Sequence, residues 1–264
     1  MPYGTVNADK MTTSDGVSSS GLYGFKNRII NGAMVINQRA TSVTATGYTV
    51  DRFEYVASQS SKATISQDTS VYPTGFNASL KALSSSAYTV GASEVFMVRQ
   101  SIEGFNSADL GWGTANAKTV TLSFWVYSSL TGTFGGAIEN SDGNRCYVYS
   151  YSIPVANTWT QITATIAGDT TGTWVGATNG IGLRVAFTFG AGSTVSGTAG
   201  SWGSTRYFSV TGATSVVGTN GATFYITGVQ LEKGSTATSF DYRPYGTELA
   251  LCQRYYWKFS PLAG

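Results

Sequence analysis

The stretch IGLRVAFTF, residues 181–189, indicates the fold most directly. Apolar side chains occupy every second position of it, and glycine, arginine, alanine and threonine stand between them. Side chains of a β-strand point alternately to opposite faces, so this alternation is typical of a strand with one buried face and not of a helix. The side chains expected to point inward are Ile181, Leu183, Val185, Phe187 and Phe189.

The same alternation recurs in WTQITATI, TLSFWVYS and EVFMVRQSI. Turn-forming clusters rich in Gly, Asn, Asp, Ser and Thr separate such runs at 140–144, 167–173, 190–200 and 218–222. Many short strands joined by such turns predict an all-β protein, either a sandwich or a jelly roll. One helix is expected near the C-terminus, around Thr247–Tyr256, with Thr247 as its N-cap. The side chains expected to point inward from the three runs are Ile162, Ala164 and Ile166; Leu122, Phe124 and Val126; and Phe96, Val98 and Ile102.

Composition argues against several classes of function. The 264 residues carry a net charge of +2 without a basic run, so no nucleic-acid partner is expected. No apolar run approaches the roughly 20 residues that span a membrane, so no membrane insertion is expected. Histidine is absent, which removes histidine bases and histidine-ligated zinc. Cys146 and Cys252 are too far apart in sequence for a disulfide framework or a metal motif, and we expect buried thiols.

Neither a metal site, a cofactor site nor a catalytic pair is expected. ENSDGNR, residues 139–145, offers oxygen ligands, but their spacing does not match a calcium-binding EF-hand loop, and Asp142-Gly143 is typical of a hairpin turn. No glycine-rich phosphate loop precedes a helix. The spacing of the fourteen acidic residues pairs none of them as a glycosidase requires. The sequence therefore favours a protein without enzymatic activity.

Three tryptophans are candidates for glycan binding. Trp112, Trp174 and Trp202 are each flanked by glycine in an expected loop. A loop tryptophan can stack on the apolar face of a sugar ring, or it can fold inward and close one end of the sandwich. Both interpretations remain open from the sequence.

A second set of aromatic residues lies on strands and near the C-terminus. In CYVYSYS three tyrosines share one face, and two aromatic side chains of TLSFWVYS fall on the face opposite the expected core. Such a stripe suits a sugar-binding face or a subunit interface, where Tyr and Trp are enriched, and we favour the interface. The interface candidates are Trp125, Tyr127, Tyr147, Tyr149, Tyr151, Tyr255 and Tyr256.

Charge gathers in the closing stretch, 229–256, of a chain that is only 11% charged. GATFYITGVQLEKG, residues 221–234, leads into this stretch and is typical of a final strand, in which Gly228 is expected to form a bulge. The bulge would reset the alternation, so that Val229 and Leu231 also point inward. Pro244 then prevents continuation into another central strand, and the charged residues suit a short amphipathic exit segment.

The segments FKNRIINGAMVINQRAT…GYTVDRFEYV and ITGVQLEKGSTATSFDYRPYGTELALCQRYYWK together resemble the carbohydrate-binding-like jelly-roll domain of tailed-phage tail fibres and other virion surface proteins. The resemblance extends over about residues 25–258. It implies a jelly roll in which the first of these segments opens the first strands, the second closes the domain, and the first and last strands lie close together. It also implies a non-enzymatic virion protein, made in the host cytoplasm and assembled as a homotrimer with other virion proteins.

The resulting expectation divides the chain into three parts. Residues 1–24 form a polar N-terminal arm or attachment segment, 25–240 the jelly-roll domain, and 241–264 an exit segment with a short helix. The expected function is a tail-fibre or receptor-binding module that contacts host surface polysaccharide. The alternatives are a capsid-decorating or structural virion protein that binds no glycan, and a polysaccharide depolymerase.

Overall fold

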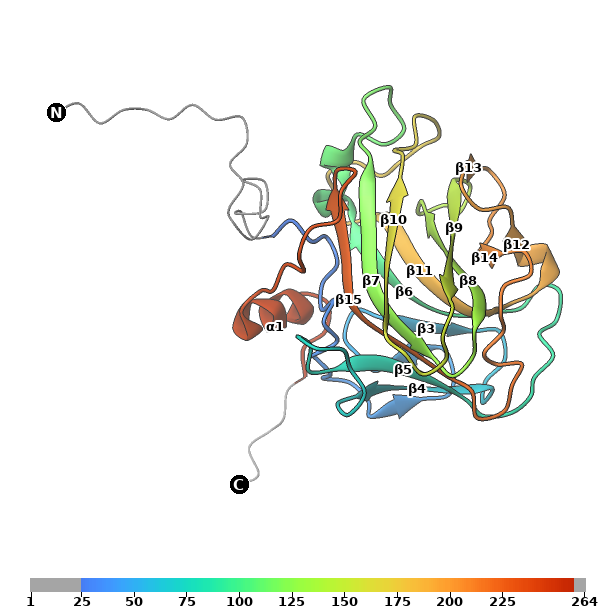
Figure 1. The fold of residues 1–264 in the computed structure, drawn as a ribbon. Coiled ribbons are helices and arrows are strands. Elements are labelled where there is room, and N and C mark those ends of the chain that lie inside the picture. Colours follow the sequence, from blue (N-terminus) through green and yellow to red (C-terminus); the bar gives the residue numbers. More distant parts are fainter. Residues whose placement is uncertain (1–24, 259–264) are drawn as a thin grey trace.

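The computed structural model describes residues 25–258, so the expected N-terminal arm, 1–24, lies outside the described residues. Two antiparallel sheets stack face to face (Figure 1). In spatial order, the first sheet contains β1 (Ser42–Val43), β4 (Ala63–Asp68), β5 (Ser79–Ser84), β15 (Thr223–Lys233), β7 (Val120–Ser128) and β10 (Thr160–Ile166). The second contains β13 (Trp202–Gly203), β9 (Cys146–Ile153), β8 (Gly132–Glu139), β11 (Ile181–Ala191), β6 (Val95–Glu103), β3 (Glu54–Ala57) and β2 (Gly47–Tyr48).

Short elements complete the described chain. The parallel pair β12 (Ser196–Gly197) and β14 (Ser209–Val210) lies in the connection between β11 and β15. The 3-10 turns are η2 (Gly104–Asn106), η3 (Ala108–Leu110) and η4 (Ser193–Val195), and the helix of the described part is α1 (Tyr245–Gln253). The predicted all-β jelly-roll sandwich with a short C-terminal helix is confirmed.

The core lies between the two sheets and follows the alternation of the sequence. The side chains of β7 and β11 that were predicted to point inward are fully buried, except for Ile181 at the start of β11, which is half-buried. Phe124 of β7 crosses the interior to Phe187 of β11 and Tyr151 of β9, with ring centroids 5.0 and 5.2 Å apart. Aromatic pairs in this edge-to-face geometry stabilise the core beyond the burial of their area.

The predicted bulge in β15 is confirmed. Gly228 has φ +61°, and the pairing of β15 with β7 shifts register between Thr227 and Gln230. Val229 and Leu231 are buried as completely as the side chains before the bulge. An extra residue at this point therefore keeps both halves of a long strand facing the same core.

The opening segment, rather than the first strand, lies beside the last strand: β4 and β5 separate β1 from β15 in the first sheet, whereas residues 28–32 bond to β15 directly. The Arg28 amide donates to the Leu231 carbonyl at 2.9 Å, and the Val229 amide donates to Gly32 at 2.9 Å. The expectation that the opening stretch forms the first strands is wrong for residues 25–41, which contain no strand. Positive φ angles at Asn31 and Met34 interrupt an extended ladder there.

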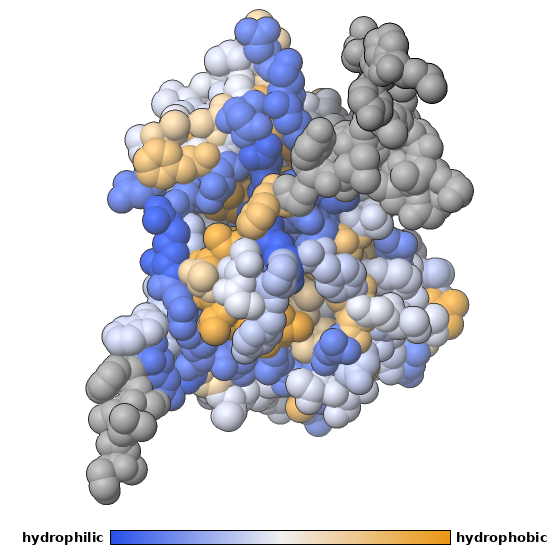
Figure 2. All heavy atoms as spheres, turned by 90° about the vertical axis from the view of Figure 1, so that its left-hand side faces the viewer, coloured by the Kyte–Doolittle hydropathy of each residue, from blue (hydrophilic) through white to orange (hydrophobic). Residues whose placement is uncertain are grey.

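α1 begins two residues earlier than expected, and Thr247 is not its N-cap. Pro244 occupies that position, without a side-chain capping bond. Its carbonyl accepts hydrogen bonds from the amides of Thr247 and Glu248, so the backbone itself closes the first turn. Figure 2 shows the face that carries α1, where apolar residues gather near the middle.

Both cysteines are buried and free, as predicted, and burial raises the pKa of the Cys146 thiol to about 11 and that of Cys252 to about 12. The predicted turn at 140–145 is also confirmed, because Glu139 of β8 pairs with Cys146 of β9 across it and Gly143 has φ +68°. Among residues 25–258, no helix is long and apolar enough to cross a membrane. No group of three His, Cys, Asp or Glu side chains that could hold a metal ion occurs in that range.

Candidate functional site

The structure brings the three glycine-flanked tryptophans together at one end of the sandwich, drawn uppermost in Figure 1. Trp112 follows η3, Trp174 lies in the loop between β10 and β11, and Trp202 begins β13. The ring centroid of Trp112 lies 4.8 Å from that of Trp174 and 5.2 Å from that of Trp202. Trp174 and Trp202 are 5.4 Å apart, and all three contacts are edge-to-face. We call these three residues the Trp cluster.

Hydrogen bonds to the backbone orient the rings of the Trp cluster. The indole N–H of Trp112 donates to the Lys118 carbonyl at 2.8 Å, and that of Trp202 donates to Ala167 at 2.7 Å. Trp112 is 7% exposed and closes the end of the core, whereas Trp174 and Trp202 are half-buried and present part of their rings to solvent. Trp112 therefore closes one end of the sandwich, and Trp174 and Trp202 remain accessible to solvent.

Asp169 holds the loop that carries Trp174. Its buried carboxylate accepts two hydrogen bonds from the Arg145 guanidinium, at 2.6 and 2.7 Å, and one from the Trp174 indole at 3.3 Å. Burial raises the pKa of this carboxyl, but the hydrogen bonds from Arg145 and Thr171 outweigh that effect and hold the pKa below its usual range. Asp169 therefore stays ionised and acts as a positioning residue. This role of Asp169 was not predicted from the sequence.

Two grooves border the Trp cluster. One, of about 160 Å³, is lined by Trp112 and Trp174 together with the polar residues Ser107 and Thr114. The other, of about 280 Å³, lies where β9 and β10, from different sheets, meet at the open edge of the sandwich. Among the residues that line this second groove are Tyr147, Ser150, Thr163 and Thr165.

Tyr147 connects the second groove to the Trp cluster. It pairs with Trp202 across β9 and β13, and the two ring centroids are 5.4 Å apart. The exposed hydroxyls of Ser150 and Thr163 make no hydrogen bond within residues 25–258, so they are available to a ligand. Aromatic rings beside free hydroxyls can pack on the apolar face of a sugar ring and bond its hydroxyls. The polar alternation of TQITATI was the signal in the sequence for Thr163.

The interface prediction is wrong for Tyr149 and Tyr151. Their side chains are 3% and 7% exposed and belong to the main core, and the Tyr149 hydroxyl donates to the Ala186 carbonyl at 2.7 Å. The tyrosine stripe of CYVYSYS faces the interior, and the opposite face of β9, with Cys146 and Val148, is covered by the 196–210 connection. Alternation located one buried face and could not show that both faces are covered.

The other interface candidates occupy two places. Trp125 and Tyr127 lie half-buried on the outer face of β7, where Tyr127 contacts Trp159 at a ring-centroid distance of 5.6 Å. Tyr255 and Tyr256 follow α1, and each packs against an arginine of its own chain. The Arg52 guanidinium lies 3.3 Å from the Tyr255 ring centroid, and that of Arg39 lies 4.0 Å from the Tyr256 ring centroid. Such cation–π contacts fix the end of the described chain to the sandwich.

Two buried carboxylates on the strands and loops that carry the Trp cluster and its neighbours are already bound by arginines. Glu139 accepts two hydrogen bonds from Arg206, at 2.6 and 2.7 Å, and Asp169 is held by Arg145. A general acid needs a protonated carboxyl with a raised pKa, and the pKa of Asp169 is shifted the other way. The arrangement suits recognition by stacking and hydrogen bonding.

No protein-family model matches the chain, and no curated protein matches it. Among solved structures it is similar to the enzymatically active domain of tailspike protein 4 of bacteriophage CBA120, with 12% identity and a TM-score of 0.43. That alignment covers 79% of this chain, which spans only 22% of the length of the tailspike chain.

The chain is also similar to the family 11 carbohydrate-binding module of Clostridium thermocellum, solved with a mixed-linked tetrasaccharide. The identity is 11% and the TM-score 0.36, over 76% of this chain and all of that one. A further likeness is to the tandem carbohydrate-binding modules of Paenibacillus barcinonensis Xyn10C, with 18% identity and a TM-score of 0.37, over 69% of this chain and 45% of that one. No role of a residue in this chain follows from these likenesses.

Proposed function

We propose that this protein is a non-enzymatic glycan-binding module of a phage virion, carried on a tail fibre or another receptor-binding structure. The observation that carries the glycan-binding part is the exposed side of the Trp cluster. Trp202 and Tyr147 stand beside a groove whose other lining groups include the free hydroxyls of Ser150 and Thr163. The virion part rests on the sequence resemblance of residues 25–258.

Recognition at this site is weak for one copy and strong for several. The grooves are open and small, and the carboxylates beside them are bound to arginines, so one copy offers a ligand only ring stacking and a few hydrogen bonds. A single-site dissociation constant of about 1 mM corresponds to only about 4 kcal/mol of binding free energy. Linked copies raise the effective concentration and can increase the overall affinity about 10²-fold or more. A homotrimer would supply such copies.

A panel of purified bacterial surface polysaccharides, immobilised and probed with the labelled protein, tests the proposal. We expect W174A and W202A to weaken binding by about tenfold or more, equivalent to about 1.4 kcal/mol, because each removes an accessible ring. W159A is the matched control, since Trp159 is also half-buried but belongs to the aromatic group of β7 and β15.

Binding by all three variants at the wild-type level would place the site elsewhere. Loss of binding only in W159A would transfer it to the outer face of the first sheet. Steady release of reducing ends from the bound polysaccharide would establish a depolymerase and contradict the non-enzymatic assignment.

A second candidate function, a structural or capsid-decorating virion protein, is favoured by a different surface. Phe25 and Phe105 are 64% and 59% exposed and line a groove of about 250 Å³ beside α1, together with Leu251. Large apolar side chains that are exposed and lie together are typical of protein interfaces. Immunogold electron microscopy of the parent virion separates the two candidates: gold at fibre tips supports receptor binding, and gold over the head supports decoration.

A further inference from the structure

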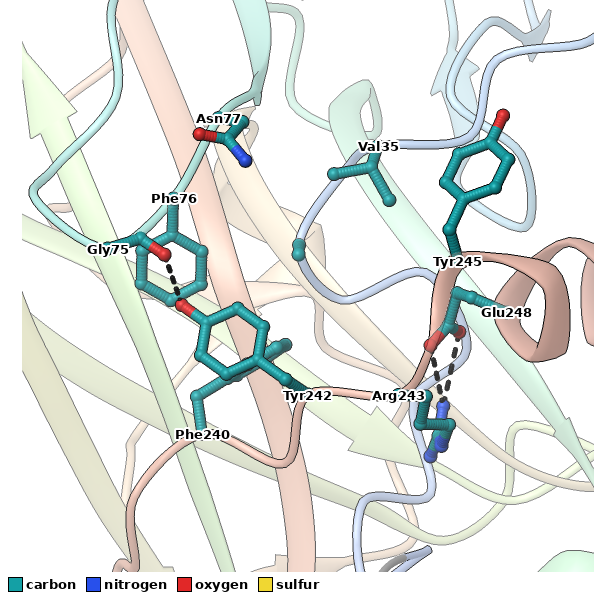
Figure 3. A pocket seen from close by; sticks show the side chains of 10 residues that line it. Val35, Gly75, Phe76, Asn77, Phe240, Tyr242, Arg243, Tyr245 and Glu248 are labelled. Carbon is teal, nitrogen blue, oxygen red and sulfur yellow. Dashed lines mark hydrogen bonds and ion pairs between the residues drawn. The ribbon is translucent and has the colours of Figure 1, made fainter.

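We infer that the chain has a second binding site, for a single neutral hexopyranose, in the groove between the 75–77 turn and the segment that leads into α1 (Figure 3). The groove has a volume of about 200 Å³. It shares no lining residue with the grooves of the Trp cluster, and its assignment does not require that cluster to bind glycan. Its lining includes Val35, Asn77, Tyr242, Arg243, Tyr245 and Glu248.

One wall of the groove is a fixed aromatic surface. The ring of Tyr242 lies 4.7 Å from that of Phe240 and 5.6 Å from that of Phe76, and its hydroxyl donates to the Gly75 carbonyl. Its side chain is nevertheless 57% exposed. A ring that is held in place and still open to solvent loses little conformational freedom when a ligand stacks on it.

The opposite wall is formed by Tyr245, in the first turn of α1. Its side chain is 63% exposed, and Figure 3 shows it across the groove from Tyr242, with Val35 between them in this view. Within residues 25–258, neither the Tyr245 hydroxyl nor the exposed Asn77 amide makes a side-chain hydrogen bond. Both therefore remain available to the hydroxyls of a ligand.

The charges at the groove cancel internally. Arg243 and Glu248 form an ion pair at 3.1 Å, and the arginine side chain is only 5% exposed. Arg243 also donates to the Ile29 and Asn27 carbonyls, and Glu248 accepts the Asn31 amide. A charged ligand would have to compete for groups that the fold already uses, so the groove favours a neutral ligand.

Size and chemistry together point to one sugar ring. Pockets for drug-sized ligands have volumes of about 300–1,000 Å³, so a groove of this volume accommodates a smaller molecule. A hexopyranose combines a C–H face that packs on an aromatic ring with hydroxyls that bond an amide and a phenol. The two tyrosines, Val35 and Asn77 supply these complementary groups.

The test is a titration of the ¹⁵N-labelled full chain with methyl β-D-glucopyranoside, methyl β-D-galactopyranoside and methyl β-D-glucuronide, followed by amide chemical shifts. We expect at least one neutral glycoside to shift the Asn77 side-chain amide and the backbone amides around Tyr245, with a dissociation constant of about 1–10 mM. Y245A should weaken this binding by about fivefold or more, Y245F should weaken it less because it keeps the ring and loses only the hydroxyl, and the glucuronide should bind at least about fivefold more weakly.

Y72A is the matched control, because Tyr72 is an exposed tyrosine that does not line the groove. The inference is overturned if no neutral glycoside shifts these signals, if Y245A binds like the wild type, or if the glucuronide binds equally well. Shifts at these signals on raising the protein concentration alone would assign the groove to self-association instead. The W174A/W202A double variant separates the two sites, since it should lose polysaccharide binding and keep the groove signals.

Discussion

The Asp169 carboxylate is buried beneath the Trp cluster, where Arg145, Thr171 and Trp174 all donate hydrogen bonds to it. Its pKa is lowered in the folded state, so the folded protein favours the charged form more than the unfolded chain does. This contribution to stability is fully present above the unfolded pKa of about 3.9 and is lost as the pH falls through the folded value. At the scale of one residue, the loop that presents Trp174 is therefore sensitive to acid.

Replacing Asp169 with asparagine should lower the free energy of unfolding by about 1–3 kcal/mol at pH 7, because Arg145 then lacks its counter-charge. The difference from the wild type should shrink as the pH falls below about 3.9, the unfolded pKa, and should vanish only below the lowered pKa of the folded protein, where the wild-type carboxyl is itself protonated. Urea unfolding at pH 7 and at several lower pH values checks this. D142N is the control, because Asp142 is an exposed aspartate near the same loop. A D169N variant as stable as the wild type at pH 7 would show that the ion pair does not hold the loop.

At the scale of one element, the bulge in β15 favours glycine at position 228 for two reasons: the positive φ angle and the lack of space for a Cβ atom. A second glycine allows the two effects to be measured separately. A Cβ at Gly228 would lie 2.6 Å from the Phe76 ring, and its φ of +61° already disfavours other residues. Gly221 has a similar φ, +73°, but a Cβ there would meet nothing within 4 Å. G221A should therefore cost about 1–2 kcal/mol, the conformational cost alone.

G228A should cost about 1–3 kcal/mol more than G221A, because the added methyl group must displace Phe76 or the strand. Chemical denaturation of the two variants measures the difference. Equal losses of stability would mean that the bulge tolerates a side chain, and that its glycine is required only for the backbone angle.

Strands with one buried face were predicted well from the sequence, and the reasons for the misses are physical. Alternation in β7 and β11 reports burial directly, and Gly228 marked the bulge because it interrupts that alternation. Tyr149 and Tyr151 were misplaced because a stripe of tyrosines on one face does not reveal which face is inside. The meeting of Trp112, Trp174 and Trp202 depends on contacts between distant loops, which spacing along the chain cannot show.

At the scale of the whole molecule, Arg243 joins the two ends of the described chain. It donates to the Ile29 carbonyl in the opening segment and forms an ion pair with Glu248 in α1. R243M should cost about 3–5 kcal/mol, because it leaves the Glu248 carboxylate buried without its partner. R254M is the matched control, since Arg254 pairs with Glu103 in a more exposed position and should contribute about 1 kcal/mol or less. Similar losses in both variants, measured by urea unfolding, would contradict the view that Arg243 clamps the two ends.

The most direct test of the central claim is a ¹⁵N NMR titration that follows the six tryptophan indole N–H signals while the protein binds an oligosaccharide taken from its preferred polysaccharide. We expect the signals of Trp174 and Trp202 to shift with a shared dissociation constant, while those of Trp159 and Trp125 stay in place. Shifts confined to Trp159 and Trp125, or binding that leaves Trp174 and Trp202 unchanged, would contradict the assignment of glycan recognition to the Trp cluster.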